Sequence, residues 1–324
     1  MRALTYICLA VVCVATVAAI KPEPTPRIEF DALESYPEGI AYNQAKNIYY
    51  VSSARLGNIG QVTPQGAYSI LHADTTLKST YGLKIHPDGK QLFACVSDAN
   101  YSKYTNPATR MKMARLIAID IQSGKKVSDV DLSALLPGKH FANDLTFDTQ
   151  RNAYVTDSFA GAIYKVSPDG KASVFAKDEL FKTEGVGLNG IVFHPDGYLI
   201  VDNSSKGQLF KVMLNNPKSV QKVMIDQYFL GADGLLLKDK NNLTMVVNGG
   251  NDKIYQLTSN DNWQTAVVSA ATASADRFTY PSTATSNGAD IWIMNAQFNQ
   301  LLDSNSVPVK KFAIQKAVFK PMKP

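Results

Sequence analysis

The stretch GVGLNGIVFHPDGYLIVDN, residues 185–203, contains the pattern that decides the fold. It consists of a loop with one polar residue, a short apolar strand, a Pro-Asp-Gly turn, a second apolar strand and a final polar cluster. The pattern recurs at intervals of about 45 residues, the length of a four-stranded propeller blade. The copies begin near Pro37, Tyr81, Ala142, Gly187, Gly231 and Tyr280. Six copies predict an all-β fold, a six-bladed β-propeller with four-stranded antiparallel blades over residues 37–324.

Further strands are visible outside this central pair. The third repeat continues with AIYKV at 162–166, a Ser-Pro-Asp-Gly turn and ASVF at 172–175. The second repeat is interrupted by a polar insertion over residues 97–115. The segment RIEF, residues 27–30, precedes the first repeat. We expect it to complete the last blade, because closing the ring leaves no sheet edge open.

Residues 1–19 have the features of a signal peptide. Arg2 is followed by an apolar run over residues 4–14 and then by small residues. That run is too short to span a bilayer, so we expect no membrane span. The alternative, a buried N-terminal strand, is disfavoured by the Pro-rich segment at 21–26. Residues 20–36 are then a linker and the possible ring-closing strand, and the protein is predicted to be secreted or periplasmic.

Cysteine content and charge narrow the class of protein. Cys8 and Cys13 belong to the predicted signal peptide, which leaves Cys95 in the apolar run LFACV as a buried strand residue rather than a nucleophile. The chain has 33 Lys and Arg against 28 Asp and Glu, a net charge of +5. The basic residues are scattered, so we expect no nucleic acid partner. We expect a monomer that takes a small-molecule substrate.

The direction of the strands separates two faces of the predicted ring. If the inner strand of each blade begins at one rim, the upper rim, then the Pro-x-Gly turns all lie on the opposite face. His86 and His194 belong to those turns, so we interpret both as structural. The irregular connections lie on the upper rim, where a rigid scaffold usually carries its function.

The residues just before the six inner strands should converge at the upper mouth of the central channel. Two carboxylates and two amide oxygens there would suit Ca²⁺, which prefers hard oxygen ligands. Without a cation the carboxylates would repel each other, and one would keep a proton. The alternative is that these residues only cap backbone groups. In chain order they are Glu38, Tyr81, Asn143, Asn189, Asp233 and Ser282.

From Pro37 to the C-terminus the sequence resembles the SMP-30/gluconolactonase/LRE-like group of calcium-dependent six-bladed propellers, which is related to paraoxonases and strictosidine synthase. The resemblance implies that Glu38, Asn189 and Asp233 bind the metal. It implies that Asn143 lies beside the metal and contacts substrate or its water, and we include it among the metal ligands. Asp233 is the implied general base, so Asp233 and Asn143 are the catalytic candidates. The matching motifs are Pro37-Glu38-Gly39, Asn143-Asp144, Leu188-Asn189-Gly190 and Ala232-Asp233-Gly234.

One position departs from that group. Gluconolactonase-type members have an arginine two residues before the asparagine, and this chain has Phe141. An apolar ester or lactone is therefore easier to accept than a sugar lactone. His140, beside it, is either an ordinary loop histidine or a base or polar contact. Tyr81, from the ring of six positions, is a further candidate substrate contact.

The insertion over residues 97–115 should also emerge on the upper rim. It is either a lid that brings Tyr104 and Arg110 to the substrate or a mobile surface loop. Asp157 and Asp202 end second strands on the same rim, where they either cap turns or support the metal ligands. The residues of the insertion with cationic or aromatic side chains are Tyr101, Lys103, Tyr104, Arg110, Lys112 and Arg115.

These patterns together favour a secreted calcium-dependent hydrolase that acts on a lactone or related ester. The alternative is a non-catalytic secreted binding propeller in which calcium is structural. A condensation of the strictosidine synthase kind has no residue signal in this sequence.

Overall fold

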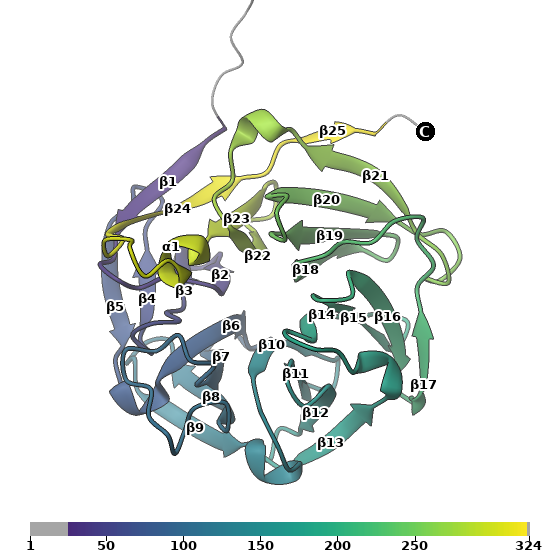
Figure 1. The fold of residues 1–324 in the computed structure, drawn as a ribbon, viewed down its shortest axis with the longest axis horizontal. Coiled ribbons are helices and arrows are strands. Elements are labelled where there is room, and N and C mark those ends of the chain that lie inside the picture. Colours follow the sequence, from purple (N-terminus) through teal and green to yellow (C-terminus); the bar gives the residue numbers. More distant parts are fainter. Residues whose placement is uncertain (1–24, 323–324) are drawn as a thin grey trace, which may run out of the picture.

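Six antiparallel sheets surround a central axis in the computed structural model, which describes residues 25–322 (Figure 1). This arrangement confirms the predicted six-bladed β-propeller with four-stranded blades. The predicted signal peptide and the first part of the linker lie outside the described residues. Within residues 25–322, no helix is both long and apolar enough to cross a membrane.

Blades one to four each have four strands, and the strand nearest the axis comes first in the chain. Blade one contains β2 (Ile40–Asn43), β3 (Ile48–Val51), β4 (Ile59–Val62) and β5 (Tyr68–His72). Blade two contains β6 (Ser79–Ile85), β7 (Gln91–Ser97), β8 (Ala114–Asp120) and β9 (Lys126–Asp131). Blade three contains β10 (Ala142–Phe147), β11 (Ala153–Asp157), β12 (Ala162–Val166) and β13 (Ala172–Lys177). Blade four contains β14 (Leu188–His194), β15 (Tyr198–Asn203), β16 (Gln208–Met213) and β17 (Asn216–Lys222).

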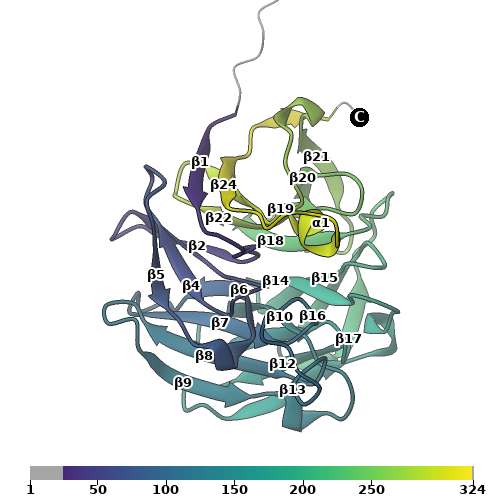
Figure 2. The same cartoon turned by 60° about the vertical axis from the view of Figure 1, so that its left-hand side comes forward.

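The two ends of the described chain complete blades five and six. Blade five contains β18 (Ala232–Asp239), β19 (Asn242–Val247), β20 (Lys253–Thr258) and β21 (Val267–Thr272), with β25 (Phe319–Pro321) as a fifth, outermost strand. Blade six contains β22 (Pro281–Ser286), β23 (Ile291–Asn295), β24 (Lys311–Lys316) and, outside them, β1 (Arg27–Asp31). Both views show β1 beside β24 (Figure 1 and Figure 2). The ring is therefore closed by a strand from the beginning of the chain and three from near its end.

Burial follows the position of a strand within its blade. All six residues of β15 are buried, because a strand near the axis is covered on both faces by neighbouring blades. The outermost strand of the same blade, β17, has only partly buried and exposed residues. At the ring closure Phe30 pairs with Phe312, and both are at most 2 % exposed. Apolar contacts between blades therefore form the core.

Short helices occur in the connections between strands. The 3-10 helices η1 (Thr75–Leu77), η2 (Ser133–Leu135), η3 (Glu179–Phe181) and η4 (Ser274–Asp276) each follow the fourth strand of a blade. The one-turn helix α1 (Phe298–Leu302) lies between β23 and β24, close to the axis in Figure 1. The interrupted connection between β7 and β8, residues 98–113, is the polar insertion seen in the sequence.

Candidate metal centre at the channel mouth

The four residues predicted to bind a metal, Glu38, Asn143, Asn189 and Asp233, line one pocket of about 70 Å³. Glu38 lies just before β2, and the other three belong to the inner strands β10, β14 and β18. Residues far apart in the sequence thus meet where the inner strands of four blades begin. The remaining lining residues are Tyr81, Tyr101, Phe141, Val186, Ser204, Asn248, Tyr280 and Phe298.

Irregular strand pairing turns these side chains toward the pocket. In β10, β14 and β18 the register with the second strand shifts near the start of the inner strand. The shifted segments contain Asn143, Asn189 and Asp233. An extra residue in a strand leaves a local gap in the ladder and changes the direction of a side chain. Each of the three polar residues therefore faces the pocket because it lies in the irregular start of its inner strand, just before the apolar run.

Glycines next to these polar residues allow the inner strands to approach closely. A Cβ atom on Gly39 would lie 2.2 Å from the carbonyl oxygen of Tyr81, and one on Gly190 would lie 2.2 Å from that of Asp233. No side chain fits at either position without moving the backbone of the next blade. The polar-Gly pairs of the sequence therefore bring neighbouring blades together at the pocket.

One oxygen of each predicted ligand is buried without a hydrogen-bond donor. These atoms are Glu38 Oε2, Asn143 Oδ1, Asn189 Oδ1 and Asp233 Oδ1. The four residues are at most 8 % exposed. A buried acceptor without a partner costs about 1–3 kcal/mol, and a charged one costs more. Four such acceptors around one pocket fit a bound cation, which would satisfy all of them together.

Neighbouring side chains fix the orientation of this set. Asn143 donates its Nδ2 to Ser158 Oγ at 3.0 Å, so its Oδ1 is the atom left without a partner. Asn248 donates its Nδ2 to Asp233 Oδ2 at 2.6 Å, so only Oδ1 of Asp233 is free. Ser282, the sixth residue of the predicted ring, donates to the Glu38 carbonyl oxygen at 2.6 Å and does not line the pocket.

The pocket has a strongly acidic environment. Burial, and then repulsion from Asp233 and Asp144, hold the pKa of Glu38 well above its usual value. Burial is also the main cause that raises the pKa of Asp233 to about 8. Asp202, buried with both carboxylate oxygens unpaired, has a raised pKa because of burial and then of Asp233 and Asp144. The cluster is thus short of positive charge, as expected where a cation binds.

The ligand set depends on the two amides. Within residues 25–322, no group of three or more His, Cys, Asp and Glu side chains is placed to hold a metal ion. Glu38 and Asp233 would supply two carboxylates to a cation, and Asn143 and Asn189 would supply two amide oxygens. Mixed carboxylate and amide oxygens suit a hard ion such as Ca²⁺ and do not suit softer metals that select imidazole or thiolate.

Aromatic side chains cover the pocket. The ring centroids of Tyr101 and Phe298 are 5.7 Å apart, and those of Tyr280 and Phe298 are also 5.7 Å apart. On another side of the pocket Tyr81 packs against Phe141, with ring centroids 4.7 Å apart. Of the predicted substrate contacts, Tyr81 and Phe141 therefore do line the pocket.

The insertion contributes Tyr101 to this cover but not the two residues that we expected. Tyr104 lines a different pocket, beside His72, and Arg110 is exposed with its guanidinium 3.4 Å from Asn100 Oδ1. Neither residue is at the channel mouth. Hydrogen bonds within the insertion explain its fixed path: the buried carboxylate of Asp98 accepts from the hydroxyls of Thr105 and Thr109 at 2.9 and 2.7 Å.

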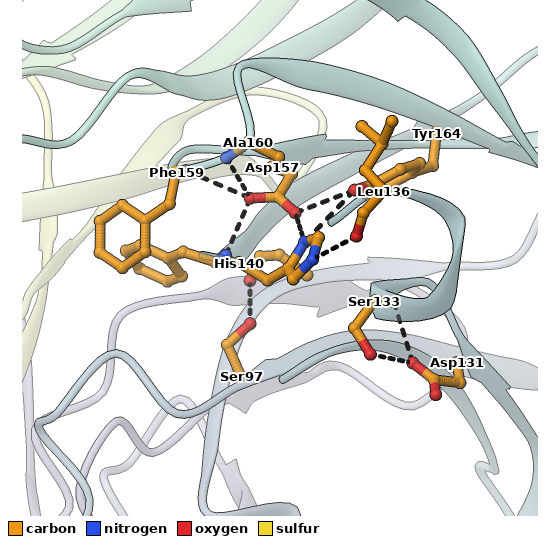
Figure 3. A network of polar contacts seen from close by, with 11 residues as sticks. Ser97, Asp131, Ser133, Leu136, His140, Asp157, Phe159, Ala160 and Tyr164 are labelled. Atoms are coloured by element: carbon orange, nitrogen blue, oxygen red, sulfur yellow. Dashed lines mark hydrogen bonds and ion pairs between the residues drawn. The ribbon is translucent and has the colours of Figure 1, made fainter. Parts of the chain in front are cut away.

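His140 lies away from the pocket in a buried polar network (Figure 3). Its Nδ1 is 2.7 Å from Asp157 Oδ2, and its Nε2 is 2.9 Å from the Leu136 carbonyl oxygen. Both partners are acceptors, an arrangement that favours an imidazole protonated on both nitrogens. The hydrogen bond to Asp157 is the main cause that raises the pKa of His140. With both nitrogens engaged, His140 is not free to act as a base on a substrate.

Asp157 is the centre of that network. Its Oδ1 accepts from three backbone N–H groups, and its Oδ2 accepts from the Tyr164 hydroxyl at 3.1 Å. Asp157 therefore caps a turn and pairs with His140, which is the first of the two roles considered for it. The backbone donors are those of Phe141, Phe159 and Ala160.

Some lining residues could not be assigned from the sequence. Tyr280 precedes an inner strand, so its place in the repeat is a usable signal. Asn248 follows the second strand of blade five, a position at which an asparagine usually caps a turn, so the sequence does not indicate that it lines the pocket. Phe298 belongs to α1, an insertion with no counterpart in the other repeats, and nothing in the sequence places it over the channel mouth.

Comparison with known proteins supports the fold. No known family matches the sequence, and no curated protein matches it either. Among solved structures, the allergen Mala s 1 of Malassezia sympodialis is 18 % identical over 90 % of this chain and 96 % of that chain, with a TM-score of 0.71. Virginiamycin B lyase of Staphylococcus aureus is 17 % identical over 90 % and 99 % of the two chains, with a TM-score of 0.59.

A third similar structure is that of a luciferin-regenerating enzyme. It is 12 % identical over 92 % of this chain and 99 % of that chain, with a TM-score of 0.60. All three match at least 90 % of this chain. At these identities the likeness supports the fold alone, which the six sheets of this chain identify as a six-bladed β-propeller.

Proposed function

We propose that the protein is a calcium-dependent hydrolase of a lactone or related ester, related to the SMP-30/gluconolactonase/LRE-like group. Glu38, Asn143, Asn189 and Asp233 would hold the ion. One observation carries this proposal: each of the four has a buried oxygen without a donor, and all four line the same pocket. The protein would be a secreted or periplasmic monomer.

Ca²⁺ suits the set because its two carboxylates and two amides are hard oxygen donors, and water can complete the coordination. A bound Ca²⁺ would polarise a carbonyl oxygen and offset negative charge that develops there. The luciferin-regenerating enzyme and the virginiamycin B lyase show that propellers of this shape support catalysis, which favours an enzyme. Phe141 and Tyr81 make the pocket wall aromatic, which favours an apolar ester over a sugar lactone.

Asp233 would accept a proton as well as hold the ion. Its Oδ1 is the oxygen without a partner that would bind the ion, and its Oδ2 accepts one hydrogen bond from Asn248. In the proposed reaction a water oxygen bonds to the acyl carbon while a water proton passes to Asp233. The acyl–oxygen bond then breaks, and Asp233 returns the proton to the leaving alkoxide oxygen, which gives an acid and an alcohol. Asn143 would orient the substrate or the water. The aromatic cover would keep bulk water away from the reacting groups.

A panel of γ-lactones and aryl esters, assayed with calcium and then with a chelator, tests this proposal. We expect turnover that the chelator abolishes and calcium restores. Asp233→Asn should lower kcat/KM by about 100-fold or more, since a proton acceptor typically contributes that much. Asp239→Asn is the matched control, because Asp239 lies in the same strand but is exposed. Folded, calcium-loaded protein without turnover of any substrate would overturn the hydrolase.

The second candidate is a non-catalytic binding propeller in which calcium is structural. The size of the pocket favours it: about 70 Å³ leaves room for an ion and a few water molecules. Asn143→Ala distinguishes the two functions. Loss of turnover at calcium saturation supports catalysis, whereas a lower melting temperature with no activity in any variant supports the structural role.

A further inference from the structure

The pocket at the channel mouth is too small for the substrates proposed above. Pockets that enclose organic ligands measure about 300–1,000 Å³, several times the 70 Å³ found here. Tyr101, Tyr280 and Phe298 are aromatic side chains in its lining, with neighbouring ring centroids 5.7 Å apart. It admits a carbonyl group beside a cation, but the rest of an ester or lactone must lie elsewhere.

A larger cavity of about 660 Å³ lies directly beside this pocket. Tyr101 and Val186 line both, so the two spaces are neighbours with these two side chains between them. The larger cavity is mostly apolar, with contributions from the insertion of blade two, the turn after β11, the connection before β14, and α1. Its remaining lining residues are Ala99, Asn100, Met111, Lys139, Phe159, Thr183, Glu184, Gly185 and Leu302.

The walls of this cavity are held in place before any ligand binds. Asp98 ties the insertion together through Thr105 and Thr109. Phe159 packs against Phe141 with ring centroids 5.3 Å apart. Such a site loses little conformational entropy on binding. Leu302, which also lines the cavity, is 59 % exposed, so a ligand bound there would remove apolar surface from water.

The charges at the cavity are few and balanced. Lys139 and Glu184 are exposed at its edge, and within residues 25–322 neither side chain forms an ion pair. One positive and one negative group do not select a strongly charged ligand. The chemistry of the lining therefore suits an uncharged hydrocarbon chain.

We propose that this cavity, the side groove, binds the hydrocarbon chain of an uncharged ester or lactone whose carbonyl group lies in the mouth pocket. The assignment rests on the proposed hydrolase and narrows its substrate class. Chain length then controls affinity: each methylene that enters the groove should raise it by about two- to fourfold, the range expected for partial to full burial.

Two measurements test the groove, one of catalysis and one of binding. In the first, kcat/KM is measured for γ-lactones whose side chains range from methyl to hexyl. It should rise with chain length in the native protein. Leu302→Asp should remove at least half of that rise, because it places a charge in the groove. Leu33→Asp is the matched control, because Leu33 is 60 % exposed and lines neither pocket.

In the second measurement, butanol, hexanol and octanol are titrated calorimetrically into the chelator-treated protein. Octanol should bind most tightly, and Leu302→Asp should lower its affinity by about tenfold. Equal affinities for the three alcohols would contradict binding in the side groove. So would an octanol affinity in Leu302→Asp that equals that of the native protein. Alcohol binding that depends on chain length, without turnover of any lactone, would support hydrocarbon binding in the side groove and contradict the proposed hydrolase. The two proposals can therefore be tested separately.

Discussion

The carboxylate of Glu38 is the strongest reason to propose a cation at the channel mouth. It is buried beside Asp233 and Asp144, and its Oε2 has no donor. In the metal-free protein this arrangement is unfavourable, because burial and repulsion both oppose the charged form. Such a residue is expected to destabilise the metal-free site and to stabilise the metal-bound one, which is why we propose Glu38 as a ligand.

Replacing Glu38 with Gln should therefore separate binding from folding. We expect calcium affinity to fall by at least about tenfold, since one of two charged ligands is lost. The free energy of unfolding in chelator should stay the same or rise, because a repelling charge is removed. Calcium titration and melting curves measure the two effects. Glu179→Gln, at an exposed side chain, is the control. A destabilised apo variant with native affinity would contradict this role.

The raised pKa of Asp233 predicts that calcium binding depends on pH. With that pKa at about 8, we expect the metal-free site to hold a proton at neutral pH. Calcium requires the ionised carboxylate, so binding releases the proton. The affinity should rise with pH by up to about tenfold per unit for each proton released and become constant above the pKa. Calorimetry in buffers of different ionisation enthalpy counts the protons. An affinity independent of pH would contradict a protonated site.

The pair of His140 and Asp157 stabilises the connection before β10, and this stabilisation should depend on pH. The raised pKa of His140 means that the folded state favours the imidazolium. Its contribution to stability is therefore complete below the unfolded pKa of about 6.5 and is lost as the pH rises through the folded pKa. The pair joins this connection to β11 and, through the His140 N–H to the Met111 carbonyl oxygen, to the insertion.

His140→Ala should lower the free energy of unfolding by about 3–5 kcal/mol at acidic pH, the usual cost of removing one partner of a buried ion pair. The difference from the native protein should shrink at alkaline pH. Urea denaturation at several pH values measures it. His72→Ala is the matched control, since His72 is only partly buried and contacts no carboxylate through its Nδ1. An equal loss at every pH would show that packing, rather than charge, is responsible.

At the level of strands, repetition made the fold predictable. The turn Pro-Asp-Gly and the apolar runs recur with a fixed spacing, so β14 and β15 could be placed and then found again in other blades. β25 could not be predicted, because the three residues Phe319–Pro321 have no turn signal and pair only through the edge of β21. α1 was missed for a similar reason: it is a single turn inside an inserted connection.

The same contrast applies to the candidate site. Glu38, Asn143, Asn189 and Asp233 occupy equivalent places in the repeats, so symmetry alone predicts that they meet. Tyr104 and Arg110 lie in an insertion without symmetry, and the hydrogen bonds of Asp98 that determine its path cannot be read from composition. His140 shows a further limit. A histidine beside the site suggests a base, and only the partners of its two nitrogens show that it is structural.

The whole ring is held closed by β1. Its pairing with β24 joins the start of the described chain to its last blade, with Phe30 opposite Phe312. The mouth pocket needs this closure, because Ser282 of blade six donates to the carbonyl oxygen of Glu38 in blade one. Stability of the ring and geometry of the site are therefore linked.

Phe30→Ala should lower the free energy of unfolding by about 3–5 kcal/mol, as expected for removing a buried aromatic side chain. It should also weaken calcium binding, since blades one and six separate more easily. Urea denaturation and calcium titration measure both. Tyr228→Ala, at a residue 65 % exposed, is the control and should change stability by less than about 0.5 kcal/mol. Native stability in Phe30→Ala would show that β1 does not close the ring.

The central claim is that four distant residues form one cation site, and diffraction from crystals grown with calcium tests it most directly. An anomalous difference map should contain a calcium peak at the channel mouth. Oxygens of Glu38, Asn143, Asn189 and Asp233 should lie about 2.3–2.6 Å from it. A map at saturating calcium with only water among these four side chains, or with calcium bound elsewhere, would contradict the account.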